Sequence, residues 1–107
     1  AYKKESRIRG LAYRNFMKKN SGMLFIFPEA SIHSMWMVNT YIPLSVAFLD
    51  KNGMILNIID MSPHTRTRNS ATSKAKYALE MNLGWFSSRS IKAGEKITGL
   101  EKAPNAE

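Results

Sequence analysis

The sequence is distinctive first for what it lacks. None of its 107 residues is cysteine, which excludes disulfide bonds, thiolate metal sites and cysteine nucleophiles. No apolar run approaches the roughly 20 residues of a membrane-spanning helix, and no signal-peptide pattern is present. Glycine-rich phosphate loops, a Gly-x-Ser-x-Gly elbow and a His-x-x-x-His pair are also missing. The motifs of the common nucleotide-binding, serine-hydrolase and zinc-hydrolase classes are therefore absent.

Acidic residues are scarce. Eight Asp and Glu stand against sixteen Lys and Arg, which makes the formal net charge +8. Seven basic residues fall within 1–20 and eight within 61–107, whereas 21–60 holds a single one. That middle stretch is also the most apolar, so we expect it to form the core while the two ends supply a positive surface. Length and a 44% hydrophobic content fit one folded domain, 1–107.

The start of the chain bears on its location. It begins with Ala1 and lacks an initiator Met, so we expect that an upstream segment has been removed, by processing or by design. On this interpretation the protein is periplasmic or secreted after loss of an export signal, with the cytoplasm as the alternative. A cysteine-free chain suits either compartment.

Hydrophobic patterning predicts mostly strands. A helix is expected from Ser6 to about Lys19, where apolar residues recur at helical spacing. Alternation and branched or aromatic content predict strands at 23–27, 34–38, 44–49, 54–60 and 96–100. Residues 74–82 fit either a helix or a strand. Residues 61–73 are predicted to form a loop, and residues 84–88 are predicted to form one helical turn. Asp50 to Gly53 predicts a tight hairpin loop between two of the strands.

These elements indicate a mainly β (α+β) fold. We expect a compact, barrel-like, largely antiparallel sheet with one or two short helices. The run 36–50 is expected to be its structural centre.

Several segments, in this order, resemble one known family. They are Arg9-Gly10-Leu11, 22–27, Trp36 to Leu44, Phe48-Leu49-Asp50, Tyr77 to Glu80 and the stretch around Gly94. Together they resemble domain-of-unknown-function family 192. The resemblance implies a compact β-rich domain, often exported, and brings no biochemical activity. The family usually has an acid where this chain has Ser45, so any function of that acid is in doubt here.

A possible metal site lies near the middle of the chain. His33, Met35 and Met37 alternate, so in a strand they share a face, and imidazole and thioether ligands suit Cu(I). The alternative is that both methionines pack in the core and His33 sits at its rim. Seven methionines spread over the chain favour this packing role. We therefore predict no metal and no other cofactor.

The best candidate binding site is the end of the Trp36 strand. Asn39 and Thr40 interrupt an apolar stretch beside Trp36 and Tyr41. A polar floor with an aromatic wall is typical of sites for small polar ligands. The alternative, which we favour, is that both polar residues satisfy backbone groups in the turn before Pro43.

Charged candidates lie further away in the sequence. Arg9 and Arg14 could clamp a carboxylate or phosphate, or pair with Glu80 or Asp50. We list Arg9, Arg14, Trp36, Asn39, Thr40 and Glu80 as ligand-binding candidates. The first hypothesis is a monomeric, non-enzymatic binding or accessory module of the cell envelope with a small polar or anionic ligand.

Two other hypotheses stay open. The charge of +8 fits nucleic acid, but the basic residues are scattered and this partner is the less favoured one. An enzyme of unknown class would use Glu80 or Asp50. A triad of Ser45 with a histidine and an acid can also be drawn from the sequence, although no motif supports it.

Overall fold

A computed structural model describes residues 1–100, 103 and 106 of the chain. The bounds of its two short helices and six strands are α1 (Lys4–Arg9), β1 (Gly22–Ser31), β2 (Ser34–Met35), β3 (Leu44–Leu49), β4 (Ile55–Met61), β5 (Asn69–Ser70), β6 (Ala75–Asn82) and α2 (Trp85–Ser88). The fold is mostly β with antiparallel pairing and short helices, which confirms the predicted class. In the described part of the chain, no helix is long and apolar enough to cross a membrane.

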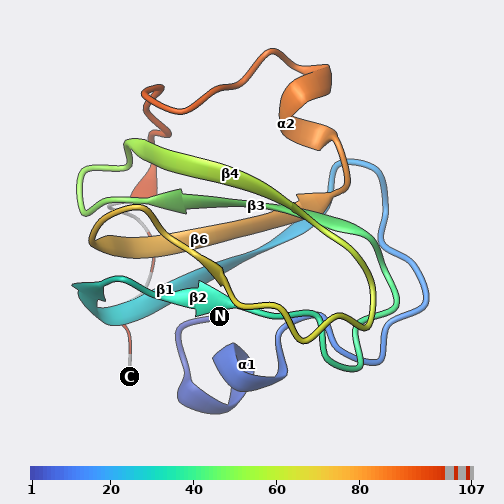
Figure 1. Cartoon of the computed structure of the whole chain (residues 1–107). Coiled ribbons are helices and arrows are strands. Elements are labelled where there is room, and N and C mark those ends of the chain that lie inside the picture. Colours follow the sequence, from blue (N-terminus) through green and yellow to red (C-terminus); the bar gives the residue numbers. More distant parts are fainter. Residues whose placement is uncertain (101–102, 104–105, 107) are drawn as a thin grey trace.

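Four strands form the main sheet, in the order β1-β6-β3-β4 (Figure 1). β3 and β4 are the predicted hairpin, with Ser45 opposite Asp60. The Asp50 carboxylate accepts hydrogen bonds from the backbone N–H groups of Asn52 and Met54, at 2.8 and 3.0 Å. Gly53 takes φ +85°, which completes the turn at little steric cost. The hairpin was predictable because its signals are local.

The sheet is covered on both faces. α1 lies on one side and α2 on the other (Figure 1). Val46, Phe48 and Phe25 belong to the core on the α1 side, while Ala47, Leu49 and Phe86 belong to the core on the α2 side. Every residue of β3 is buried, as expected for a central strand with successive side chains on opposite faces. The two faces therefore offer two separate places for a site.

The main sheet is not closed into the expected barrel, because its edge strands β1 and β4 do not pair with each other. Each edge has another partner instead. The Ile26 N–H donates to the Ala1 carbonyl at 2.9 Å along β1. The Asn57 side chain of β4 donates to the Ser70 carbonyl at 3.1 Å. Because these contacts cover the edge strands, the sheet need not close into a barrel to prevent its edges from pairing with strands of other chains.

Other predictions of secondary structure need correction. The helix ends at Arg9 rather than near Lys19, because Gly10 takes φ 52° and ψ −132° and leaves the helical region. The strand predicted at 34–38 is only Ser34–Met35. The strand predicted at 96–100 is a single bridge between Lys96 and Met54. Each error falls where the chain follows tertiary contacts rather than a repeating pattern.

The ambiguous segment 74–82 is strand β6, the inner neighbour of both β1 and β3. The predicted strand at 23–27 continues as β1 through Pro28 to Ser31, with a register shift between Ile26 and Ser31. Proline is tolerated there because β1 is an edge strand.

Candidate functional site

Two neighbouring pockets open on the α1 side of the sheet. The first, which we call the Glu80 pocket, has a volume of about 320 Å³. It is lined by Arg7, Ile8, Gly10, Phe25, Ser34, Met35, Trp36, Arg68 and Glu80. The second, the Asn39 pocket, has a volume of about 470 Å³ and is lined by Glu5, Ile8, Arg9, Ala12, Tyr13, Trp36, Val38 and Asn39. Both pockets share Ile8 and Trp36 in their walls, and we call the two pockets together the Trp36 groove.

Glu80 is the least expected feature of this groove. It sits on the central strand β6 between Val46 and Met23 of the neighbouring strands, and its side chain is only 4% exposed. No hydrogen bond or ion pair joins it to another described residue. Burial raises the pKa of Glu80 from its ordinary 4.5 to about 7, because a carboxylate loses its hydration there.

The carboxyl group of Glu80 faces the pocket. Within the described residues, no buried side-chain oxygen or nitrogen lacks a hydrogen-bond partner. Since Glu80 has no such partner and lines the pocket, its oxygens must be reached from the pocket. A carboxyl group held in this way is costly for the fold and available to a ligand.

Trp36 lines both pockets. Its side chain is 43% exposed, and the guanidinium carbon of Arg68 lies 4.6 Å from the centre of its ring. This distance is typical of a cation–π contact. Arg7 also lines the Glu80 pocket, and its Nη1 donates to the backbone carbonyls of Tyr2 and Ile26, at 2.6 and 3.1 Å.

The turn that carries Asn39 is fixed on both sides. The Asn39 carbonyl accepts a hydrogen bond from the Tyr13 N–H at 2.9 Å, and Asn39 Nδ2 donates one to the Tyr13 hydroxyl at 2.9 Å. The Thr40 carbonyl accepts the His64 N–H at 3.1 Å. Asn39 and Tyr13 take φ 55° and 65°, which is unfavourable for a bulky tyrosine. Strain of this kind is concentrated at functional sites, so the pair marks this pocket as a candidate.

The predicted site residues divide into two groups. Arg9, Trp36 and Asn39 line the Asn39 pocket, and Trp36 lines the Glu80 pocket together with Glu80. Arg14 and Thr40 line neither pocket. Thr40 is 6% exposed, and its hydroxyl donates to the Val38 carbonyl at 3.2 Å. This contact agrees with the alternative interpretation, in which Thr40 satisfies a backbone group of the turn before Pro43.

Arg68 is a site residue that the sequence does not reveal. It lies in the segment 61–73, for which the sequence predicts an exposed loop, and no local pattern links it to Trp36. Only the pairing of β2 with β5 brings the two side chains together, because Met35 lies opposite Asn69.

The histidine and methionines of the proposed copper set make packing contacts. Met37 is fully buried in the core, and Met35 packs against the same core. The His33 ring stacks on Phe27 with 3.7 Å between ring centres, and its Nε2 is 3.0 Å from the Glu29 carbonyl. These contacts favour the packing interpretation.

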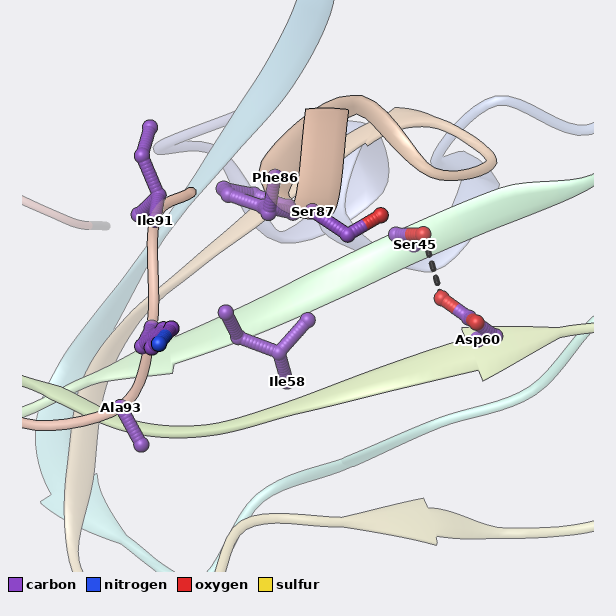
Figure 2. A pocket seen from close by; sticks show the side chains of 8 residues that line it. Ser45, Ile58, Asp60, Phe86, Ser87, Ile91 and Ala93 are labelled. Carbon is purple, nitrogen blue, oxygen red and sulfur yellow. Dashed lines mark hydrogen bonds between the residues drawn. The ribbon is translucent and has the colours of Figure 1, made fainter. Parts of the chain in front are cut away.

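A third pocket of about 380 Å³ lies on the α2 side of the sheet and contains Ser45 (Figure 2). The Ser45 hydroxyl donates to the Asp60 carboxylate at 2.7 Å and accepts the Gly84 N–H at 3.0 Å. Neither histidine lines this pocket, so the triad drawn from the sequence lacks its base here. Ser45 is 1% exposed. Its contact with Gly84, the residue before α2, ties that helix to the sheet, and its contact with Asp60 links β3 to β4.

Comparisons with known proteins agree with the fold. A crystal structure from Sinorhizobium meliloti 1021, described as a putative transcription regulator, is 33% identical, with a TM-score of 0.88 over 92% of this chain and 78% of that one. A protein of unknown function from Novosphingobium aromaticivorans DSM 12444 is 27% identical, with a TM-score of 0.87 over 92% of this chain and 71% of that one. No curated protein matches the chain.

The family model of DUF192, described as "Uncharacterized ACR", matches residues 1–99. This match covers the same ordered segments that carry the resemblance in the sequence. The chain therefore belongs to the DUF192 family of uncharacterised proteins.

Proposed function

We propose that this protein is a non-enzymatic binding or accessory module that takes a small polar ligand in the Trp36 groove. The observation that carries the proposal is Glu80, a carboxyl group that is 4% exposed, has no partner among the described residues and lines the groove. A partnerless buried acid costs the fold several kcal/mol. A ligand that meets this acid accounts for its presence.

The rest of the groove supplies the parts that small-molecule sites use. Trp36 and Tyr13 provide aromatic surface, and Asn39 and Arg9 provide polar groups at one end. The volumes of about 320 and 470 Å³ suit a ligand of modest size. The Tyr13–Asn39 contacts hold this end in place before a ligand arrives, which lowers the cost of ordering on binding.

Ligand screening with matched variants tests the proposal. Thermal-shift and NMR screens of sugars, small anions and amino compounds are run on the wild type, Trp36→Ala and Asn39→Gly. Glycine keeps the positive φ at position 39 and removes the amide. Trp85→Ala is the matched control, because Trp85 is also stacked under an arginine, Arg89, at 4.3 Å and is the first residue of α2, away from the groove. We expect ligands whose binding is lost in the groove variants and kept in the control.

Two outcomes would contradict this function. One is that no compound in the screen binds the wild type. The other is that compounds bind equally well to Trp36→Ala and to the wild type, which would place binding outside the groove.

A second candidate function is nucleic-acid binding. The charge of +8 and the Arg68–Trp36 and Arg89–Trp85 pairs favour it. So does the similar structure from Sinorhizobium meliloti, which is described as a putative transcription regulator. The two tryptophans lie toward opposite faces of the sheet, which is a poor arrangement for one strand of nucleic acid. Fluorescence anisotropy with single-stranded and duplex DNA decides the question. Binding that falls steeply with salt supports this candidate, and no binding at low salt refutes it.

We propose the cell envelope as the place of action, with the family resemblance as support. A net charge of +8 would also favour contact with anionic envelope polymers. Fractionation of cells that express the full gene product tests this location. Recovery with a periplasmic marker is the expected result, and recovery with a cytoplasmic marker would refute it.

A further inference from the structure

The Glu80 pocket contains both signs of charge. Glu80 lies at its buried end, and Arg68 stacks on Trp36 at its exposed rim. Like Glu80, Arg68 makes no hydrogen bond or ion pair with any other residue that the structure describes. Stacking on an aromatic ring covers the face of a guanidinium and leaves its edge N–H groups open to an acceptor. Among the described residues, the pocket therefore offers one acidic group, Glu80, and two basic ones, Arg68 and Arg7, and no ion pair joins Glu80 to either.

This combination discriminates between classes of ligand. A simple cation would meet Glu80 but would also face Arg68 and Arg7, the other charged residues that line the pocket. A simple anion would meet Arg68 but would be repelled by an ionised Glu80. A molecule with an ammonium group and a carboxylate satisfies both ends at once.

We infer that the Glu80 pocket binds an amino-acid-like zwitterion, with the ammonium group at Glu80 and the carboxylate at Arg68. This inference rests on the proposed function and specifies its ligand class. Phe25, Met35 and Trp36 form apolar walls of the same pocket, so the ligand side chain is expected to be apolar. The volume of about 320 Å³ restricts it to a single amino acid or a very small peptide.

Binding of this class has a measurable proton linkage. Burial holds the pKa of Glu80 at about 7 in the free protein, so the group is largely protonated below that pH. A bound ammonium group favours the carboxylate and lowers this pKa. At about pH 6, binding is therefore expected to release protons. A guanidinium group does not lose its proton in the working pH range, so the proton release reports on the carboxyl group.

The test uses sets of three matched probes. Each common apolar amino acid is compared with the amine that lacks its carboxylate and with the carboxylic acid that lacks its amine. For leucine these are isoamylamine and 4-methylpentanoate. Isothermal titration calorimetry in two buffers of different ionisation enthalpy measures affinity and proton release together. We expect at least one amino acid to bind roughly tenfold or more tightly than either half-molecule, which is about 1.4 kcal/mol or more.

Variants connect the binding to the pocket. Glu80→Gln and Arg68→Ala are each expected to weaken amino-acid binding roughly tenfold or more, and Glu80→Gln also abolishes proton release. Arg66→Ala is the matched control, because Arg66 is exposed in the same loop and does not line the pocket. Urea unfolding checks that each variant is folded.

The outcomes separate this inference from the broader function. If sugars or singly charged probes bind in a Trp36-dependent manner and no amino acid binds better than its halves, the groove binds ligands but the zwitterion inference is wrong. If no probe binds, or if Trp36→Ala changes nothing, both proposals are wrong. Equal binding by Glu80→Gln and the wild type also refutes the inference.

Discussion

Replacement of Glu80 by glutamine should make the protein more stable at neutral pH. The folded protein holds the pKa of Glu80 at about 7, whereas the unfolded chain restores the ordinary value of 4.5. Below about pH 4.5 the carboxyl group is protonated in both states and imposes no penalty. Between pH 4.5 and about 7 only the unfolded state releases the proton, so the free energy of unfolding falls as the pH rises. Above about pH 7 the penalty is complete and constant.

The magnitude follows from the same interval. Each pH unit between 4.5 and about 7 lowers the free energy of unfolding by about 1.4 kcal/mol, so the full loss of stability is about 3 kcal/mol. Glutamine has nearly the same shape and does not titrate. The difference in unfolding free energy between Glu80→Gln and the wild type should therefore increase by about 3 kcal/mol from pH 4.5 to pH 8.

Urea unfolding followed by tryptophan fluorescence measures this difference across the pH range. Glu29→Gln is the matched control, because it makes the same chemical change at an exposed position, and its difference from the wild type should stay nearly flat. Each variant differs from the wild type at one position, so contributions from the rest of the chain cancel in the difference. A Glu80→Gln difference that is constant within about 0.5 kcal/mol across the range would refute the reasoning, because it would mean that Glu80 is hydrated or paired.

Other predictions concern stability. Ser45→Ala removes the hydrogen bonds to Asp60 and Gly84 and should lower the free energy of unfolding in urea by about 1–3 kcal/mol. Ser87→Ala, at an exposed position, should lower it less. Equal losses of stability in the two variants would contradict a role for Ser45 in holding α2. At Gly53 a Cβ atom would lie 2.4 Å from the Ile97 carbonyl oxygen, so Gly53→Ala should lower the thermal midpoint more than Gly94→Ala. Gly94 has a similar positive φ, and a Cβ there would meet no atom within 4 Å. A larger effect at Gly94 would count against this turn geometry.

Local signals made much of the fold predictable. The β3–β4 hairpin follows from alternation on both strands and from the Asp50 to Gly53 turn. The helical turn predicted at 84–88 is α2, which begins after Gly84 at φ 81°. The class of fold follows from the same patterns, whereas the barrel does not, because sequence patterns do not specify whether edge strands meet.

The candidate site was predictable only in part. Trp36 and Asn39 were noticed because a polar residue interrupts an apolar stretch, which is a local signal. That Glu80 has no partner among the residues that the structure describes depends on the pairing of β6 with β1 and β3, which are distant in sequence. The position of Arg68 on Trp36 likewise depends on the pairing of β2 with β5. Long-range pairing of this kind is invisible to periodicity and propensity.

The most direct test of the account is an NMR titration of the Glu80 side-chain carboxyl carbon in the free protein and with a saturating amino acid. We expect a midpoint of about 7 in the free protein and a clearly lower midpoint when the ammonium group is bound. A midpoint near 4.5 in the free protein would contradict the claim that Glu80 is a partnerless buried acid. A midpoint that the bound amino acid leaves unchanged would contradict the claim that this acid meets the ligand.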